Sequence, residues 1–257
     1  MKRPGAAPAV PAAPGFRTAL ARLFTIQAAF TYERMLGVGF AFAAEPLLRA
    51  LRRGGPGGEG AFRAALARQS GFFNAHPYLA ALAVGAVARA EADGAPPERI
   101  ERLRAALVGP LGSLGDRLIW AGWLPACAAV ALLMVAFGAR AWAVVVFLAL
   151  YNVVHVWLRV WGLRQGWRAG VGVAGALAAP GLQRSLELVA PVAAMLVGAA
   201  LPALLGWYPF RVRWEVPVAA GAAVLFAAGV RLLQGRATGL VTAALALAVV
   251  VGVGVLW

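Results

Sequence analysis

Long apolar runs without charge dominate the second half of the chain. The runs are residues 118–139, 141–158, 169–183, 188–210, 216–230 and 237–257. A helix needs about 20 apolar residues to cross the hydrocarbon core of a bilayer. Residues 118–139 and 237–257 meet this length, whereas 169–183 and 216–230 fall short of it. The pattern predicts an all-α polytopic integral membrane protein with about four to six membrane segments.

The first third of the chain mixes apolar and charged positions more finely. Residues 16–53 place Arg17 and Arg22 between apolar side chains, which predicts amphipathic helices too charged to be simple spans. Residues 71–88 carry no charge but are marginal in length, and Pro77 interrupts them near their start. Such a stretch forms either a clean span or a re-entrant or broken element covered by protein or water. Both interpretations stay open on the sequence.

A charged segment precedes the apolar runs. Residues 98–107 predict a short charged helix, and the glycine-rich residues 109–115 predict a link after it. Asp116 follows that link and precedes an apolar run, so it is a candidate N-cap as well as a candidate site residue.

Small residues also recur among the apolar runs. Gly162, Gly166 and Gly170 are spaced by four, which places them on one helix face and predicts close helix packing. Cys127 is the single cysteine, so no internal disulfide forms, and its apolar context predicts a packing role.

Composition agrees with a lipid environment. The 257 residues are 62% hydrophobic and 13% charged, an apolar excess that a soluble protein of this size cannot bury. The net charge of +14 comes from arginines spread between apolar blocks, without a basic helix, which argues against nucleic acid and for anionic headgroups. Residues 1–15 lack the apolar core of a signal peptide and predict a disordered cytoplasmic tail.

Polar residues in apolar context are the candidates for function, because burying them in a membrane is costly. They are Glu33, Asn74, His76, Asp116, Asn152 and His155. The two histidines lack metal-ligand spacing, and no cofactor motif is present. Hydroxyl-rich solutes such as sugars suit these side-chain types.

Structural alternatives compete with each assignment. Glu33 could form an ion pair with Arg34 or Arg117, and Asn74 could cap backbone groups freed by the proline. Asn152 and His155 share a helix face at i, i+3, so a hydrogen bond explains them as well as a ligand does.

Four segments in order resemble the IID subunit of the mannose-type phosphotransferase system. Thr31-Tyr-Glu-Arg-Met-Leu-Gly-Val-Gly-Phe40 is similar to the family's Asn-Tyr-Glu-Arg-Met-Gln-x-x-Gly-Phe. Phe72-Phe-Asn-Ala-His-Pro-Tyr-Leu79 is similar to Phe-Phe-Asn-Thr-His-Pro-Tyr-Leu. Gly109-Pro-Leu-Gly-Ser-Leu-Gly-Asp116 is similar to Gly-Pro-Leu-Ala-Gly-Ile-Gly-Asp. Tyr151-Asn-Val-Val-His155 and Gly162-Leu-Arg-Gln-Gly-Trp167 resemble later family stretches.

The resemblance implies a subunit of the cytoplasmic (inner) membrane that forms a hexose channel with a IIC subunit. Separate IIA and IIB subunits would carry the phosphoryl group, and IIC–IID pairs would assemble into a trimer. Glu33, Asn74 and Asp116 would lie at or near the sugar, with His76 and Asn152 as further binding candidates. The IID-like domain would cover residues 16–210, followed by additional membrane segments in residues 211–257.

Two other functions remain as alternatives. One is a regulatory IID relative that binds IIC without transporting, which the replacement of an Asn and a Gln by Thr31 and Leu36 favours. The other is an intramembrane enzyme that uses Asp116 with His155, for which activity without partner subunits would be diagnostic.

Overall fold

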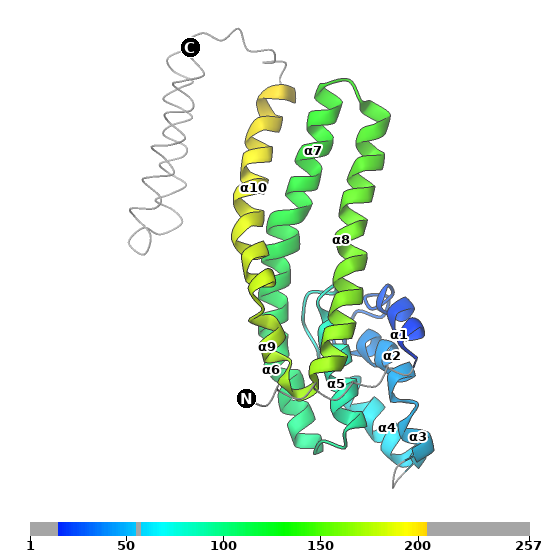
Figure 1. Cartoon of the computed structure of the whole chain (residues 1–257). Coiled ribbons are helices and arrows are strands. Elements are labelled where there is room, and N and C mark those ends of the chain that lie inside the picture. The colour runs from blue at the N-terminus through cyan, green and yellow to red at the C-terminus, as the bar shows by residue number, and fades with distance from the viewer. Residues whose placement is uncertain (1–14, 55–57, 205–257) are drawn as a thin grey trace, which may run out of the picture. The chain divides into compact units, whose positions relative to one another are not determined.

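A computed structural model describes residues 15–54 and 58–204 of the chain (Figure 1). These residues form helices and two isolated backbone bridges, without a strand. The helices are α1 (Phe16–Leu23), α2 (Gly37–Leu48), α3 (Leu51–Gly54), α4 (Gly58–Gln69), α5 (Ala80–Ala92), α6 (Pro97–Gly115), the π-helix η1 (Asp116–Trp123), α7 (Leu124–Ala136), α8 (Arg140–Ala169), the 3₁₀ turn η2 (Gly170–Gly172), α9 (Ala174–Leu177) and α10 (Pro180–Leu204). The predicted tail up to residue 14 and the runs at 216–230 and 237–257 lie outside the described residues, as does the proposed domain boundary at 210.

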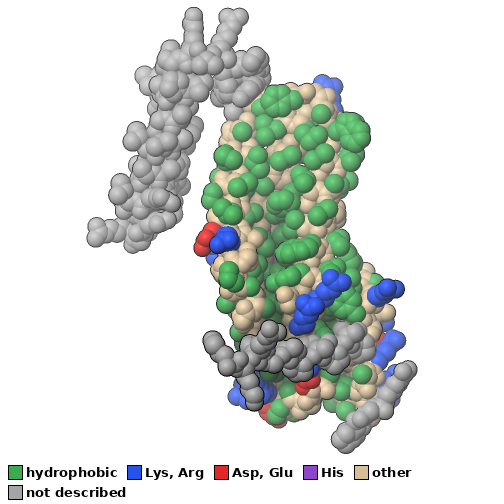
Figure 2. Space-filling model, in the orientation of Figure 1, with side chains coloured by type: hydrophobic (Ala, Val, Ile, Leu, Met, Phe, Trp, Pro, Cys, Tyr) green, Lys and Arg blue, Asp and Glu red, His purple; other side chains and the backbone are tan. Residues whose placement is uncertain are grey.

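Three helical segments of the described chain are long and apolar enough to cross a membrane. They are Pro97–Ala136, Arg140–Gly172 and Ala174–Leu201. Large apolar side chains lie exposed along α7, α8 and α10, where a bilayer would cover them (Figure 2). The all-α membrane fold predicted from the apolar runs is confirmed. Residues 169–183 do not form a separate span, because they contain η2, α9 and the start of α10.

The helices α1 to α5 lie beside the lower part of α8 (Figure 1). In α1, Ala19 and Leu23 are buried while Arg17 is exposed, so the predicted amphipathic helix is present. Residues 71–88 are a broken element: residues 71–79 are irregular, and α5 begins only at Ala80, after Pro77. With 13 residues, almost all buried by protein, α5 is no membrane span of its own.

Close backbone packing joins α5 to α8. A Cβ on Gly166 would overlap the Leu82 carbonyl oxygen, and a Cβ on Gly85 would overlap the Leu163 carbonyl oxygen. The two helices therefore approach each other as only glycine allows. This confirms the packing role predicted from the four-residue glycine spacing.

The glycine-rich link predicted at 109–115 is helix instead. The α6 helix runs unbroken from Pro97 to Gly115 and continues through η1 into α7, so Asp116 does not cap a helix start. Each glycine in a helix costs about 1 kcal/mol and an internal proline such as Pro110 about 3 kcal/mol. The α6 helix counters these costs by burying Ile100, Leu107 and Leu111. Pro125 has no N–H to donate, which is consistent with the wide π-helical turns ending at Trp123.

Charges reappear at similar depths on the three long segments. The Trp123 indole nitrogen donates to the Leu150 carbonyl at 3.2 Å, and Gly122 packs against Val189, so these residues are level with one another. Arg117 and Arg184 lie about one and a half turns below them, and Arg159 lies about two and a half turns below Leu150. From Arg117 to Ala136 the helix rises about 28 Å, which matches the thickness of a hydrocarbon core. We call the apolar region above this level the apolar belt.

Candidate functional site

The first two motif segments, residues 31–40 and 72–79, lie side by side. The amide of Leu36 donates to the Phe73 carbonyl at 2.9 Å, and the amide of Phe73 donates to the Arg34 carbonyl at 3.2 Å. These bonds join the loop that carries Glu33 to the loop that carries Asn74. Two segments about 40 positions apart in sequence are thus held together by backbone hydrogen bonds.

The first of these loops holds a strained residue. Met35 has a φ of 50°, a left-handed conformation that non-glycine residues rarely adopt. Thr31 supports the turn, since its carbonyl accepts from the Met35 amide at 2.7 Å and its hydroxyl oxygen accepts from the Arg34 amide at 3.2 Å. Backbone strain of this kind concentrates at functional sites, where surrounding structure maintains it.

Arg104 of α6 fixes the second loop. Its guanidinium donates to the carbonyl oxygens of Gln69, Gly71 and Phe72 at 2.9, 2.6 and 3.0 Å. The same group lies between the rings of Phe40 and Phe73, at 5.1 and 5.2 Å from their centroids. Residues 69–73 do not continue the helix, and the buried guanidinium of Arg104 supplies the hydrogen-bond donors for their carbonyl oxygens.

The third motif reaches the second one through Gly115. A Cβ on Gly115 would overlap the His76 imidazole, so only glycine permits this contact. One helical turn later, Trp120 places its indole 5.3 Å from the same ring. Asp116, next to Gly115, is exposed beside this contact.

The fourth motif meets the second through Tyr78. Its hydroxyl lies 2.6 Å from the Tyr151 hydroxyl, and its ring stacks on His155 with centroids 4.1 Å apart. The guanidinium of Arg159 lies over the same ring, 4.4 Å from the Tyr78 centroid, and donates to the Leu23 carbonyl at 3.1 Å. The partly buried cluster of His76, Tyr78, Tyr151, His155 and Arg159 therefore ties the second motif and the end of α1 to α8.

Several buried polar atoms of this cluster have no hydrogen-bond partner. They include His76 Nε2, both ring nitrogens of His155 and Arg159 Nη1. Burial first, and then the positive charges of Arg159 and His155, lower the pKa of His76 to about 4. His76 is therefore neutral at physiological pH.

The structure separates the five predicted site residues into two groups. Glu33, Asn74, Asp116 and Asn152 are exposed, whereas His76 is buried. Glu33 forms no ion pair with Arg34 or Arg117, and no hydrogen bond joins Asp116 to His155.

Asn152 differs from the other exposed residues in its surroundings. Its amide nitrogen donates to the Leu148 carbonyl of its own helix at 2.8 Å. It shares no hydrogen bond with His155, the partner that its i, i+3 spacing suggests.

Other residues of this region escaped the sequence reasoning. Arg104 and Arg159 gave no signal beyond being arginines near apolar runs, and Trp120 is one of nine tryptophans in the chain. Exposed aromatic rings accompany the exposed polar groups: Tyr32, Phe72 and Trp120 are 90%, 52% and 45% exposed. Polar hydrogen-bonding groups beside aromatic faces are the combination that binds sugar rings. Across residues 15–54 and 58–204, no cluster of three metal-ligating side chains occurs.

The fold and these loops define an all-α membrane protein whose polar motif residues gather at the edge of its apolar belt. Residues 14–256 match the sequence model of a protein family, the PTS system mannose/fructose/sorbose family IID component. The chain therefore belongs to this family.

Curated relatives come from several bacteria. The chain is 28% identical over 178 residues to the mannose-specific EIID component of the Escherichia coli K12 PTS system, over 67% of this chain and 62% of that protein. It is 27% identical to the fructose permease IID component of Bacillus subtilis strain 168, over 66% and 62% of the two chains. It is 29% identical to the sorbose-specific EIID component of Klebsiella pneumoniae, over 63% and 59%. The chain thus spans about three fifths of the length of these relatives.

Solved structures agree with this assignment. A chain of the mannose transporter ManYZ in complex with microcin E492 superimposes with a TM-score of 0.56 at 27% identity, covering 72% of this chain and 68% of that chain. A second structure, described only as a membrane protein, has a TM-score of 0.64 over 93% of this chain and 96% of its own length. At 20% identity this second likeness shows the fold alone.

Proposed function

We propose that this chain is the IID subunit of a sugar transporter and forms the sugar path together with a IIC subunit. Family membership and the likeness to a chain of the ManYZ mannose transporter support this role. The observation that carries the proposal is the convergence of four separate motif segments on one region. Segments that serve only to span a bilayer have no need of such convergence.

The sugar contacts are assigned to Glu33, Asn74 and Asp116. Glu33 can accept hydrogen bonds from sugar hydroxyls, and Asn74 can both donate and accept. Neither side chain forms a hydrogen bond with the described protein, so both are available to a ligand. Tyr32, Phe72 or Trp120 would stack on the apolar face of the ring.

His76 and Asn152 take different parts in this assignment. His76, buried beneath the loop, would position it rather than touch the sugar. Asn152 retains its amide oxygen as an acceptor for a ligand that reaches α8.

Phosphoryl transfer is assigned to separate IIA and IIB subunits. The ring nitrogens of His76 and His155 that lack partners are buried, so a phosphocarrier protein could not reach them. The channel unit would be a IIC–IID pair within a trimer, in the cytoplasmic membrane. The IID-like domain would extend over residues 16–210, with residues 211–257 adding membrane segments.

Co-expression with the IIC subunit of the same organism tests the proposal. A tag on this chain should retain IIC in constant stoichiometry, and the complex should bind a hexose. A complex without sugar binding would indicate a regulatory subunit. A chain that purifies alone, well folded and without affinity for IIC, would refute the assignment.

A further inference from the structure

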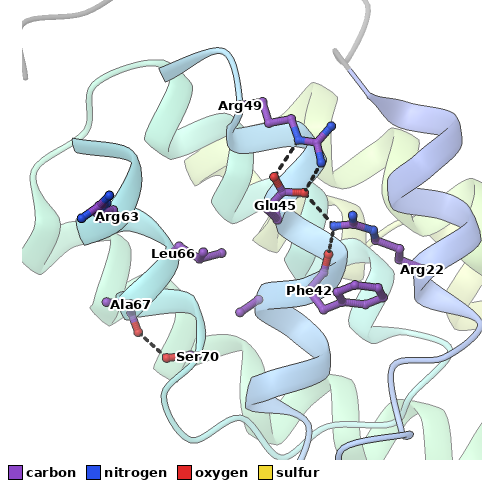
Figure 3. A pocket seen from close by; sticks show the side chains of 9 residues that line it. Arg22, Phe42, Glu45, Arg49, Arg63, Leu66, Ala67 and Ser70 are labelled. Atoms are coloured by element: carbon purple, nitrogen blue, oxygen red, sulfur yellow. Dashed lines mark hydrogen bonds and ion pairs between the residues drawn. The ribbon is translucent and has the colours of Figure 1, made fainter. Parts of the chain in front are cut away.

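A groove separate from the motif loops lies between α1, α2 and α4 (Figure 3). The groove is open to the surface and has a volume of about 690 Å³. Its lining residues are Arg22, Ala41, Phe42, Glu45, Arg49, Arg63, Leu66, Ala67 and Ser70. Three arginines face a single carboxylate there, so the groove carries excess positive charge.

The charged end is held in a fixed geometry. Glu45 accepts from Arg22 at 2.7 Å and from Arg49 at 2.6 and 3.0 Å (Figure 3). Partial burial alone would raise the pKa of Glu45, but the hydrogen bonds from Arg49 and then Arg22 hold it below the ordinary value. Glu45 thus stays ionised and orients both guanidinium groups.

Free donors remain at this end after these bonds. Arg63 is 77% exposed and uses only its Nε towards Glu59, at 3.0 Å. Arg49 is 56% exposed. Each guanidinium carries five N–H donors in a fork that matches phosphate oxygens, so both retain donors for an anion.

The rest of the groove is apolar. Ala41, Phe42, Leu66 and Ala67 line it, and the Phe42 ring is 48% exposed with the Arg22 guanidinium 4.2 Å from its centroid. A ligand that fills the groove must therefore be anionic at one end and apolar along its length.

The apolar part lies towards the membrane. Leu23, at the end of α1, accepts from Arg159, which marks the lower edge of the apolar belt. The start of α2 packs on the end of α4, since a Cβ on Gly37 would overlap the Gly71 carbonyl oxygen. Ala41 and Phe42 follow within about one turn, whereas Arg49 lies about 10 Å further along α2, away from the belt.

We propose that this groove binds an anionic phospholipid such as phosphatidylglycerol. Its phosphate lies between Arg49 and Arg63, and part of an acyl chain lies along Phe42 and Leu66 towards the bilayer. The polarity of the groove along its length favours a lipid over an acidic protein segment, which would leave the apolar part uncovered. The site is independent of the sugar contacts and of the proposed transport function.

Native mass spectrometry of the full chain in detergent tests the lipid site. The sample is titrated with phosphatidylglycerol or phosphatidylcholine. The wild type should retain phosphatidylglycerol preferentially, and the double variant Arg49→Gln with Arg63→Gln should weaken its binding by about tenfold or more. Arg99→Gln is the matched control, because Arg99 is exposed on α6 outside the groove and should leave binding unchanged.

Further measurements keep the result interpretable. Thermal unfolding in lipid-free detergent reports whether the double variant folds. If the double variant does not fold, the single variant Arg63→Gln is used in the lipid titration. Inorganic phosphate at millimolar concentration should not displace the lipid. Equal binding of both lipids, displacement by phosphate, equal loss in the control variant, or loss of a co-purified protein in place of lipid would each overturn the proposal.

Discussion

Individual side chains in this protein divide into exposed polar groups and buried groups that hold them in place. Asn74 exemplifies the first kind, since it is exposed on a loop that other residues fix. Arg104 exemplifies the second kind, because its three bonds to carbonyl oxygens determine where that loop lies. The loop can therefore present Asn74 in one position before a ligand arrives, which reduces the entropy cost of binding.

Replacing Asn74 with alanine should weaken sugar binding by about 1–3 kcal/mol, because a ligand hydroxyl would lose its amide partner. Isothermal titration of the IIC-containing complex measures the change. Glu98→Gln, an exposed polar substitution in the first turn of α6 and outside the motif segments, serves as the control. An unchanged isotherm in a folded Asn74→Ala complex would exclude Asn74 from the sugar site.

His76 should make the protein less stable in acid. Its pKa is about 4 in the folded protein and 6.5 as an ordinary histidine, so the unfolded state binds more protons between these values. Stability should therefore be unaffected above about pH 7 and should fall as the pH drops from 6.5 towards 4. Thermal unfolding at pH 7.5 and 5.0 should show a larger decrease for the wild type than for His76→Gln. Equal decreases would contradict the assigned burial.

Glycine residues allow α5 and α8 to pack with their backbones in direct contact. The α5 helix is too short to span a bilayer and is stabilised by its contact with α8. That contact depends on Gly85 and Gly166, each facing backbone atoms of the other helix. Backbone cannot move aside as a flexible side chain does, so even one added methyl group forces the helices apart.

Gly166→Ala should lower the free energy of unfolding by about 1–3 kcal/mol. Gly112→Ala is the matched control, since Gly112 lies in a helix with no atom within 4 Å of its added Cβ. Alanine there should be neutral or stabilising by up to about 1 kcal/mol, given its higher helix propensity. Thermal unfolding in one detergent compares the two variants. Similar effects of both would argue against the close α5–α8 contact.

The whole described molecule has an apolar belt and one arginine-rich end. Within the described residues, the turn between α7 and α8 has Arg140 as its one basic residue, whereas arginines are frequent on α1–α6 and at the end of α8. Arginine-rich ends of membrane proteins face the cytoplasm. The end that carries α1–α5 is therefore expected on the cytoplasmic side.

Cysteine labelling in intact cells tests this orientation. With Cys127 replaced by alanine, Ala141→Cys at the start of α8 should react with a membrane-impermeant maleimide from outside. Ala64→Cys on α4 should react only after the membrane is opened, because it lies at the arginine-rich end. The opposite labelling pattern would reverse the orientation, and equal labelling of both sites would contradict the span between them.

Several features of this protein follow from the sequence alone. Charge-free runs of sufficient length determine the membrane fold, because no other solvent accommodates so much apolar surface. Pro77 made a broken element at residues 71–88 one of two interpretations, and the tertiary structure decided for it, because Pro46 and Pro110 show that a proline in this chain can also lie inside a helix. The spacing of Gly162 and Gly166 predicts a packing face, and the four motif segments identify the family. Whether Glu33, Asn74, His76, Asp116 and Asn152 bind sugar remains a prediction.

Other features depend on contacts between residues distant in sequence. The helix through residues 109–115 forms because burial of Ile100, Leu107 and Leu111 in α6 outweighs the low helix propensity of its glycines and of Pro110, an energy that no local pattern contains. The pairing of the Glu33 and Asn74 loops, the burial of His76 against Gly115 and the role of Arg104 likewise arise only on folding. So does the basic groove, whose lining comes from α1, α2 and α4. Sequence determines which side chains avoid water, but tertiary packing decides which of the polar ones stay exposed together.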